Sequence, residues 1–236
     1  KMNVLIFTKN LEQYNPFIDR LLQFAGDVKI IYPDDHPRKS HAGWPSFLKV
    51  CENFNPDLII SFYYSKIIQD EILKTASLAV NFHGSLLPNY AGAHALNWQI
   101  INGEKTSGVT IHELTSTVDG GRIISQNSFQ IEFEDTANDV LRKGIQCSTE
   151  MLGKFIEDYK SGMIMMYQQV PTGNEFSCIK RKAEDGEITK DMDHIKAYNM
   201  IRALVTPWPG AFYYNDDGQK IVMKEYLTLD EVKEIL

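Results

Sequence analysis

Four short apolar runs, each followed by a segment with helical periodicity, constrain the fold of this chain more than any other feature of its sequence. They span residues 4–7, 28–32, 58–62 and 78–82. A continuous apolar run of this length is typical of a strand that is buried on both faces, and consecutive parallel strands require a crossover, usually a helix. The alternation therefore predicts an α/β protein whose parallel sheet is covered by helices on both faces.

The spacing of apolar residues also predicts the crossovers and the elements that follow the fourth run. Two further strands are expected at residues 109–114 and 128–133, the second because apolar and polar residues alternate there. Apolar residues at helical spacing predict the helices. The expected helices lie at residues 11–25, around Phe47–Cys51, and at 67–73, 94–102, 137–160 and 194–205.

The character of the sequence changes near residue 165, after which the segments are short and Gly and Pro recur. The apolar stretches 212–214 and 221–223 flank Asn215-Asp216-Asp217-Gly218, which is a good signal for a β-hairpin. We therefore predict a main α/β domain at residues 1–165 and a small α+β appendage, with a helix and a hairpin, at residues 166–236.

The charge balance restricts the partners of the chain. Its 236 residues include 24 Lys and Arg against 31 Asp and Glu, for a formal net charge of -7, and the longest basic run is Lys180–Lys182. A protein that lives on nucleic acid needs an excess of Lys and Arg on one face, and a helical membrane span needs about 20 apolar residues. We therefore expect neither nucleic acid nor a membrane as a partner.

The cysteines and the first residues indicate the compartment. Cys51, Cys147 and Cys178 are far apart and form no CxxC motif, which favours a reducing cytoplasm over a disulfide framework. No signal peptide is expected, because polar residues directly follow the first apolar run. The six His and three Cys show no ligand spacing, so no metal site is expected either.

Two polar elements are candidates for chemistry. Asn81 and His83 end the fourth apolar run, where a parallel sheet usually binds its ligands, and in extended backbone they project to the same side. Asp119 precedes two glycines, after the predicted strand at 109–114. Taken alone, each has a simpler explanation: a capping Asn with a surface His, and an ordinary turn.

The order of the motifs is more specific than any one of them. Asn-x-His-x-Ser-Leu-Leu-Pro-x-Tyr-x-Gly begins at Asn81, and is followed by Asn-Gly-Glu at 102–104, by Gly-Val-Thr-Ile-His at 108–112 and by Val-Asp-Gly-Gly-x-Ile-Ile at 118–124. This series resembles the folate-dependent formyltransferase family, and the resemblance covers nearly the whole chain. It implies a Rossmann-like formyltransferase domain at residues 1–165.

Three features bear on the branch of that family. Residues 7–11 lack the glycine-rich phosphate loop of the glycinamide ribonucleotide branch. Residues 180–188 and 201–212 resemble both methionyl-tRNA and sugar-amine formyltransferases, but the tail is shorter and less basic than the barrel expected of the tRNA branch. Residues 61–64, together with His83-Gly84-Ser85, look most like enzymes that formylate 4-amino sugars on nucleotide carriers.

The resemblance implies a reaction and a set of ligands. A formyl group would pass from 10-formyltetrahydrofolate to the amine of a nucleotide-linked sugar, such as a dTDP-4-amino-4,6-dideoxyhexose, for O-antigen or other surface polysaccharide (lipopolysaccharide) synthesis. The alternatives are methionyl-tRNA or glycinamide ribonucleotide formyltransferase and, in another class, 10-formyltetrahydrofolate hydrolase or a non-catalytic folate-binding protein. The exposed aromatic residues expected on the tail hairpin, Tyr213 and Tyr214, suggest a homodimer.

The resemblance also implies the site residues. Asn81, His83 and Asp119 would be catalytic, as an oxyanion donor, a base or second donor, and a group that orients the imidazole. The residues expected to bind the folate are Phe62, Tyr63, Tyr64, Leu114, Thr115 and Val118, although one tyrosine of the pair can belong to the core. The residues expected to contact the acceptor are Asn10, Lys66, Tyr90 and His94, with a solvated Lys66 and a helix-start His94 as simpler explanations.

One departure from the family pattern concerns the acceptor. Position 91 is Ala where many relatives have Arg, and position 95 is Ala where many have Pro. Because a folate glutamate and a sugar diphosphate are both anions, a local cluster of Lys and Arg is expected in the cleft despite the acidic total. The sequence does not indicate where that cluster lies.

Overall fold

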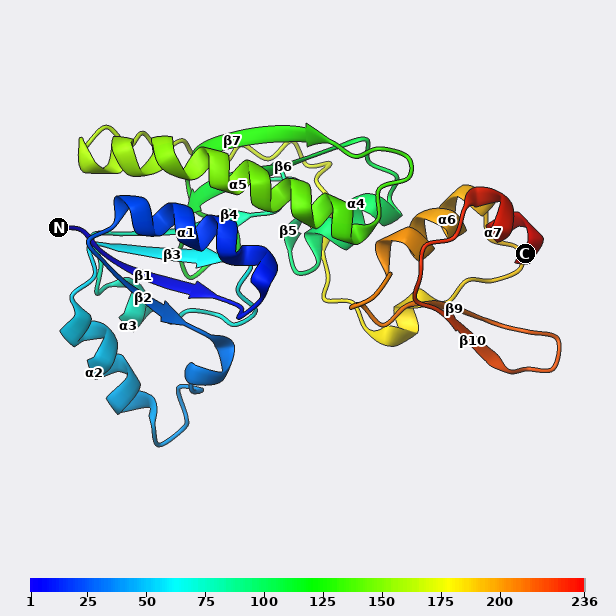
Figure 1. The fold of residues 1–236 in the computed structure, drawn as a ribbon, viewed down its shortest axis with the longest axis horizontal. Coiled ribbons are helices and arrows are strands. Elements are labelled where there is room, and N and C mark those ends of the chain that lie inside the picture. The colour runs from blue at the N-terminus through cyan, green and yellow to red at the C-terminus, as the bar shows by residue number, and fades with distance from the viewer. Residues whose placement is uncertain (236) are drawn as a thin grey trace.

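A six-stranded mixed sheet forms the centre of the computed structural model, which describes residues 1–235 (Figure 1). The strand order is β2-β1-β3-β4-β6-β7. The first four strands pair in parallel, as predicted, whereas β6 and β7 extend the sheet in antiparallel fashion. The strands are β1 (Asn3–Thr8), β2 (Asp27–Ile31), β3 (Leu58–Phe62), β4 (Leu78–His83), β6 (Thr106–Glu113) and β7 (Ile123–Gln130).

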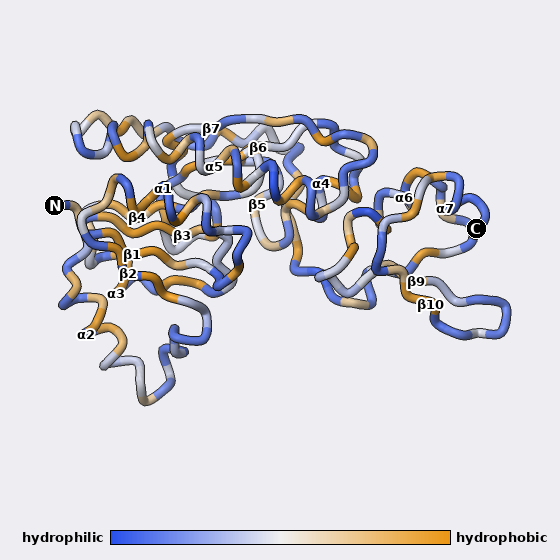
Figure 2. The backbone as a smooth tube through the Cα atoms, in the orientation of Figure 1, coloured by the Kyte–Doolittle hydropathy of each residue, from blue (hydrophilic) through white to orange (hydrophobic). Residues whose placement is uncertain are grey.

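Helices cover the two faces of this sheet because the apolar side chains of its central strands alternate between them. On β1, Val4 and Ile6 pack toward α1 (Asn15–Phe24) and α5 (Ala137–Lys160), whereas Leu5 and Phe7 pack toward the opposite side. That second face is covered by α2 (Trp44–Phe54) and α3 (Asp70–Leu73). Strands buried on both faces are apolar throughout, and Figure 2 shows this hydrophobic centre.

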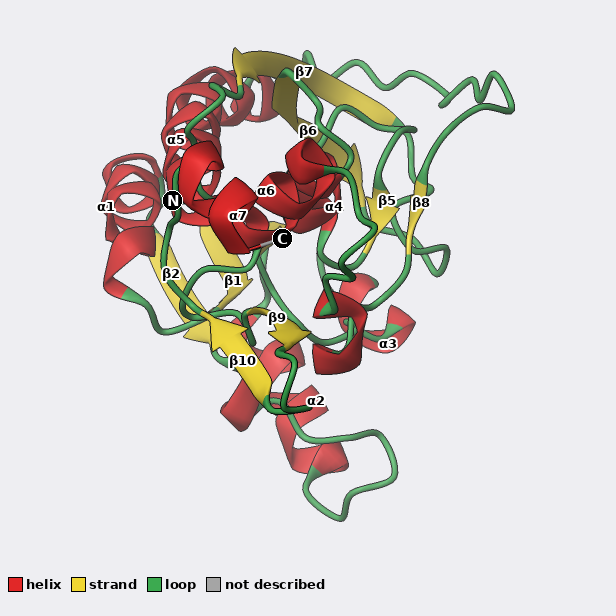
Figure 3. Ribbon diagram, turned by 90° about the vertical axis from the view of Figure 1, so that its right-hand side faces the viewer, coloured by secondary structure: helices red, strands yellow, loops and turns green. Residues whose placement is uncertain are grey.

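The remaining helical turns and bridges are short. They are η1 (Glu12–Tyr14), η2 (Pro33–Asp35), η3 (Ala183–Gly186), α4 (Ala95–Ile101), and the two-residue strands β5 (Ala91–Gly92) and β8 (Ser177–Cys178). β5 and β8 pair in parallel and lie side by side in Figure 3. This pair joins the segment after β4 to the start of the C-terminal region.

The C-terminal region contains the predicted helix and hairpin. These are α6 (His194–Ala203), β9 (Ala211–Tyr214) and β10 (Lys220–Met223), followed by α7 (Leu229–Ile235), a helix not predicted from the sequence. The region shares a core with the main domain, because Ile201 and Ala211 cluster with Ile100 of α4 and Val140 of α5. The boundary near residue 165 stays a prediction.

Two elements differ most from their predicted ranges. The helix expected at 67–73 contains only the four residues of α3, and the strand expected at 128–133 instead spans 123–130. The register of β7 explains the second difference, because pairing with β6 runs from Thr106 opposite Gln130 to His112 opposite Ile123. Within residues 1–235, no helix is both long and apolar enough to cross a membrane.

A buried side-chain hydrogen bond between α4 and α6 offers a test of this packing. Asn97 Nδ2 donates to the Ala203 carbonyl at 2.6 Å, and Asn97 is 2% exposed. We expect Asn97→Ala to lower the free energy of unfolding by about 1–3 kcal/mol in urea titrations, because a buried carbonyl at a helix end loses its partner. The control is Asn138→Ala, whose amide donates to the Thr206 carbonyl at the surface; an equal loss in both variants would contradict the prediction.

Candidate active site

The structure brings Asn81, His83 and Asp119 together at the carboxyl end of β4. Asn81 Nδ2 lies 3.4 Å from Asp119 Oδ1, and His83 Nδ1 lies 3.5 Å from Asp119 Oδ2. The first two residues are two apart on one strand, so their side chains project to the same side. Asp119 comes from the turn that follows β6, the antiparallel neighbour of β4.

Three contacts hold the Asp119 turn in place. Asp119 has a φ of 50°, in the left-handed region, and Gly121 approaches the Glu113 carbonyl so closely that a Cβ would lie 1.8 Å from its oxygen. Gln169 Nε2 donates to the carbonyls of Asp119 and Gly121 at 2.7 and 2.8 Å. The Gly92 amide donates to Asp119 Oδ2 at 2.8 Å. The carboxylate is thereby directed at the other two residues.

Asp119 remains a carboxylate although it is largely buried. Burial alone would raise its pKa, but the contacts with His112, His83 and the Gly92 amide outweigh burial and hold the pKa at about 2. The site therefore contains a fixed negative charge at neutral pH.

His83 is 8% exposed, and this burial lowers the pKa of its imidazole, despite the opposing effects of Asp119 and the Tyr90 carbonyl. Its Nε2 donates to the Tyr90 carbonyl at 2.8 Å. In the neutral ring, Nδ1 then carries the lone pair and faces Asp119. This nitrogen can accept a proton at neutral pH.

His112 on β6 is a fourth polar residue of the site, and it was not among the residues predicted from the sequence. Its Nε2 accepts from Asn81 Nδ2 at 3.1 Å and lies 3.5 Å from Asp119 Oδ1, while Nδ1 donates to the Glu113 carbonyl at 2.9 Å. The pairing of β4 with β6 places His112 directly opposite Asn81. The sequence does show a histidine in the strand expected at 109–114, but only the antiparallel register with β4 places that histidine beside Asn81.

The aromatic residues at the end of β3 and just after it do not gather in one pocket. Phe62 has no exposed surface and stacks on Phe17 with ring centroids 3.9 Å apart, so its ring belongs to the core, and a contact between this residue and folate stays a prediction. Tyr63 stacks on Tyr14 beside α5, whereas the Tyr64 hydroxyl contacts His36 at 2.7 Å on the opposite face of the sheet. A left-handed φ of 49° at Tyr63 accompanies this divergence.

The other residues expected to bind folate lie between β6 and Asp119. Leu114 is half-buried and packs on the core beneath α2, with its amide bonded to the Ala79 carbonyl. Thr115 and Val118 are exposed on the loop that leads into Asp119. Both are positioned to border the site, and their contact with folate stays a prediction.

Two of the four expected acceptor contacts are engaged elsewhere. The Lys66 ammonium donates to the carbonyls of Pro33 and His36, and the Tyr90 side chain is 4% exposed, so neither presents a free group to the site. Asn10 is exposed on the loop that follows β1. His94 is exposed at the start of α4, where its Nδ1 accepts from the Arg181 amide at 3.2 Å.

Three cationic side chains lie near His94. Burial is the largest cause of the lowered pKa of its imidazole, and the positive charges of Arg181, Lys180 and Lys9 lower this pKa further. Arg181 lies 4.7 Å above the Trp98 ring, and its Nε is buried without an acceptor among residues 1–235. We call Lys9, Lys180 and Arg181, beside His94, the cation cluster. It adjoins the β5–β8 pair, whose Gly92 contacts Asp119.

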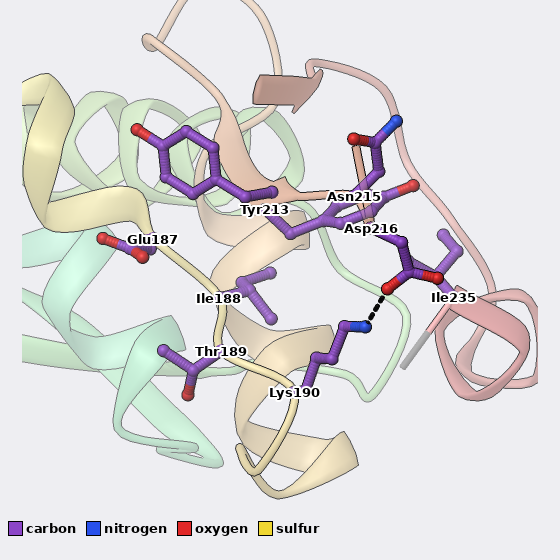
Figure 4. Close-up of a pocket in the computed structure, with 9 residues that line it drawn as sticks. Glu187, Ile188, Thr189, Lys190, Tyr213, Asn215, Asp216 and Ile235 are labelled. Carbon is purple, nitrogen blue, oxygen red and sulfur yellow. Dashed lines mark hydrogen bonds and ion pairs between the residues drawn. The ribbon is translucent and has the colours of Figure 1, made fainter. Parts of the chain in front are cut away.

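Two hollows elsewhere contain none of these residues. One, of about 460 Å³, lies in the C-terminal region between residues 187–190 and the hairpin, and the Lys190–Asp216 ion pair spans its rim (Figure 4). The other, of about 710 Å³, is a groove between η1, the start of α1 and α5. The candidate site is the polar cluster at the end of β4, because it brings a carboxylate, an amide and two imidazoles together.

This geometry can be compared with that of known proteins. Residues 10–156, more than half of the chain, match the family described as formyl transferase. The chain belongs to the formyl transferase family. The match confirms the predicted family and, with it, the predicted class of enzyme, a transferase.

Individual relatives agree with this assignment. The bifunctional polymyxin resistance protein ArnA of Wigglesworthia glossinidia brevipalpis is 38% identical over 209 residues, which is 87% of this chain and 31% of that protein, so the chain spans about a third of its length. A 4-N formyltransferase from Francisella tularensis has a TM-score of 0.75 at 21% identity and covers 96% of this chain and 98% of its own.

A third relative was solved with a ligand. HypX from Aquifex aeolicus, in complex with tetrahydrofolic acid, has a TM-score of 0.76 at 20% identity, covering 94% of this chain and 37% of that chain. At these identities the two solved structures establish the fold, and they confirm the predicted α/β formyltransferase architecture.

The lowered pKa of His83 gives this site a pH signature. Protonating a histidine whose pKa is lower in the folded state than in the unfolded state destabilises the fold, so stability present above pH 6.5 should decline as the pH falls below it. We expect urea titrations of His83→Gln to lose part of the decline that the parent shows between pH 7 and 5. His36 and His94 contribute equally in both proteins.

The matched control is His194→Gln, at the exposed start of α6, which should keep the slope of the parent protein. A parent-like slope in His83→Gln would show that His83 is not buried in its neutral form.

Proposed function

We propose that this chain transfers the formyl group of 10-formyltetrahydrofolate to the amine of a nucleotide-linked amino sugar. The observation that carries the proposal is the cluster at the end of β4, where an anionic Asp119 faces a neutral imidazole and a side-chain amide. A base and a hydrogen-bond donor beside one reacting centre are what acyl transfer to an amine requires.

The reaction balances without a covalent enzyme intermediate. The amine nitrogen forms a bond to the formyl carbon, and the bond between that carbon and N10 of the folate breaks. The attacking amine releases one proton, and N10 takes up one proton as it leaves. The products are the formamide and tetrahydrofolate.

Each polar group has a role that fits its contacts. His83 Nδ1 holds the lone pair that can accept the amine proton, and Asp119 stabilises the imidazolium that results. Asn81 Nδ2 donates to His112 at 3.1 Å and to Asp119 at 3.4 Å, so the longer of these two bonds is the one that a formyl oxygen would replace. Asp119 itself keeps its charge, given its pKa of about 2.

The folate would lie against the loop from Thr115 to Val118, beside Asp119. The exposed Val118, which is 62% accessible, offers an apolar contact, and the backbone groups of the loop offer hydrogen bonds. When bound, the folate supplies the formyl group on a nitrogen that leaves readily.

The cation cluster supports a diphosphate on the acceptor. Lys9 is half-buried at the carboxyl end of β1, and Lys180 and Arg181 lie two and three residues after the end of β8. The resemblance expects an arginine at position 91, which is Ala in this chain; β8 pairs with β5 at that residue and leads to these two cations. A nucleotide carrier such as dTDP, and a role in O-antigen synthesis, remain part of this proposal.

A homodimer also stays a prediction. Within residues 1–235, β10 pairs with no strand except β9, and Tyr214, Ile221 and Val222 of the hairpin are at least about a third exposed. The hairpin is the surface that the predicted dimer would use.

Initial rates with a panel of acceptors test the proposal. Incubated with 10-formyltetrahydrofolate, the protein should release tetrahydrofolate only when a nucleotide-linked amino sugar is present, and Asn81→Ala should lower kcat by about 10²–10³-fold. The control variant is Asn138→Ala at the surface. Release without an acceptor would identify a hydrolase. Turnover with methionyl-tRNA or glycinamide ribonucleotide instead would identify one of those branches, and any of these outcomes would overturn the proposal.

A second prediction concerns the cation cluster. Because a charged group that binds an anion contributes more than a neutral one, Lys9→Gln and Lys180→Gln should each raise the KM for the nucleotide sugar about tenfold. The KM for the folate should not change. Lys196→Gln, on the exposed face of α6, is the control. Equal effects on the two KM values would argue that the cluster does not bind the acceptor.

A further inference from the structure

The backbone carbonyl of Tyr90 determines which nitrogen of His83 is available. His83 Nε2 lies 2.8 Å from this oxygen, and a carbonyl can only accept, so Nε2 carries the hydrogen. In the neutral ring Nδ1 is then unprotonated and faces Asp119 at 3.5 Å. Any displacement of the Tyr90 carbonyl would free the ring to rotate or to change tautomer.

Tyr90 holds this carbonyl in an unusual backbone conformation. Its φ is 59°, in the left-handed region that residues other than glycine rarely adopt, so its surroundings must stabilise it. Its amide donates to the Phe176 carbonyl at 2.8 Å, and its ring packs on the Phe176 ring with centroids 5.1 Å apart. These contacts act on the backbone and on one face of the ring.

The far end of the Tyr90 side chain is fixed by a carboxylate. The hydroxyl donates to Glu104 Oε1 at 2.7 Å and accepts from Asn102 Nδ2 at 3.1 Å. Burial first, and then Glu104, raise the pKa of Tyr90 well above its usual value, so the phenol stays a donor. Among residues 1–235, this is the one hydrogen bond that the Glu104 carboxylate makes.

The loop that carries Tyr90 also reaches Asp119. Two residues after Tyr90, the Gly92 amide donates to Asp119 Oδ2 at 2.8 Å. One short segment therefore places an acceptor against Nε2 of the imidazole and a donor against the carboxylate that faces Nδ1. A shift of this segment would change both neighbours of His83 together.

We propose that Tyr90 and Glu104 are positioning residues for His83: their hydrogen bond anchors the Tyr90 carbonyl, which holds the imidazole with Nδ1 toward Asp119. The inference rests on the proposed role of His83 in formyl transfer. The other titratable groups that face His83 are Asp119 and His112, and none of the variants below replaces them.

The test compares Tyr90→Phe and Glu104→Leu, which remove the hydrogen bond, with Glu104→Gln, which keeps an acceptor for the phenol. The first two should lower kcat about tenfold with little change in the KM for folate, because a small misplacement of the base slows chemistry more than binding. The acid limb of the kcat–pH profile should shift to lower pH by about half a pH unit, because the Tyr90 carbonyl stabilises protonated His83 and its displacement would lower the pKa of the imidazole. Glu104→Gln should recover most of the activity.

Tyr198→Phe is the control for a merely structural effect. Tyr198 has no exposed surface, and its hydroxyl contacts the Phe133 carbonyl and Tyr226 in the C-terminal region. It should lose stability in thermal unfolding while its kcat and pH profile stay unchanged. Unchanged kcat and pH profile in both Tyr90→Phe and Glu104→Leu would overturn the inference.

A second measurement does not depend on activity. In protein labelled with ¹⁵N-histidine, the His83 signals, assigned by their loss in His83→Gln, should report a hydrogen on Nε2 in the parent and a mixture of tautomers in Tyr90→Phe. If the parent shows no formyl transfer but this change occurs, the proposed function fails and the positioning network stands. If transfer occurs and the tautomer does not change, the network fails.

Discussion

The carboxylate of Asp119 joins segments that the sequence keeps far apart. It accepts from the Gly92 amide, faces His83, and contacts Asn81 and His112 across the β4–β6 pair. Gln169, beyond the end of α5, holds the turn that carries it. A buried charge is stable only when its neighbours compensate for lost hydration, so these contacts keep Asp119 ionised and also fix the candidate site in place.

The net charge of the chain is -7, but the region around His94 carries mainly positive side chains. Lys180 and Arg181 belong to the longest basic run in the chain. The pairing of β8 with β5 places them near His94, where Lys9 also lies. Charges act over short distances in a protein, because salt and water screen the rest. An acidic chain can therefore present a cationic surface to an anionic acceptor, and the position of that surface depends on the pairing of two-residue strands.

Local signals in the sequence were sufficient to predict an element where its own apolar pattern or capping residues specify it. The first four strands are apolar because both of their faces are covered, and α5 has the predicted bounds because Thr136 and Asp139 form a capping box at its start. Local signals were insufficient where the structure of a segment depends on the segment that it packs against. The register with β6 moved β7 toward the N-terminus, and Phe62 turned out to be core because α1 stacks Phe17 on it.

By itself, the sequence determined the parallel strands, the order of the motifs and the expectation that Asn81, His83 and Asp119 act together. Periodicity along the chain encodes the strands, whereas the expectation about the three site residues comes from the family resemblance that the ordered motifs carry. Only the tertiary structure placed His112 opposite Asn81, directed the Tyr90 carbonyl at His83 and gathered the cations around His94. Each of these depends on antiparallel register, a left-handed backbone or pairing between distant segments, and no local pattern in the sequence specifies such long-range geometry.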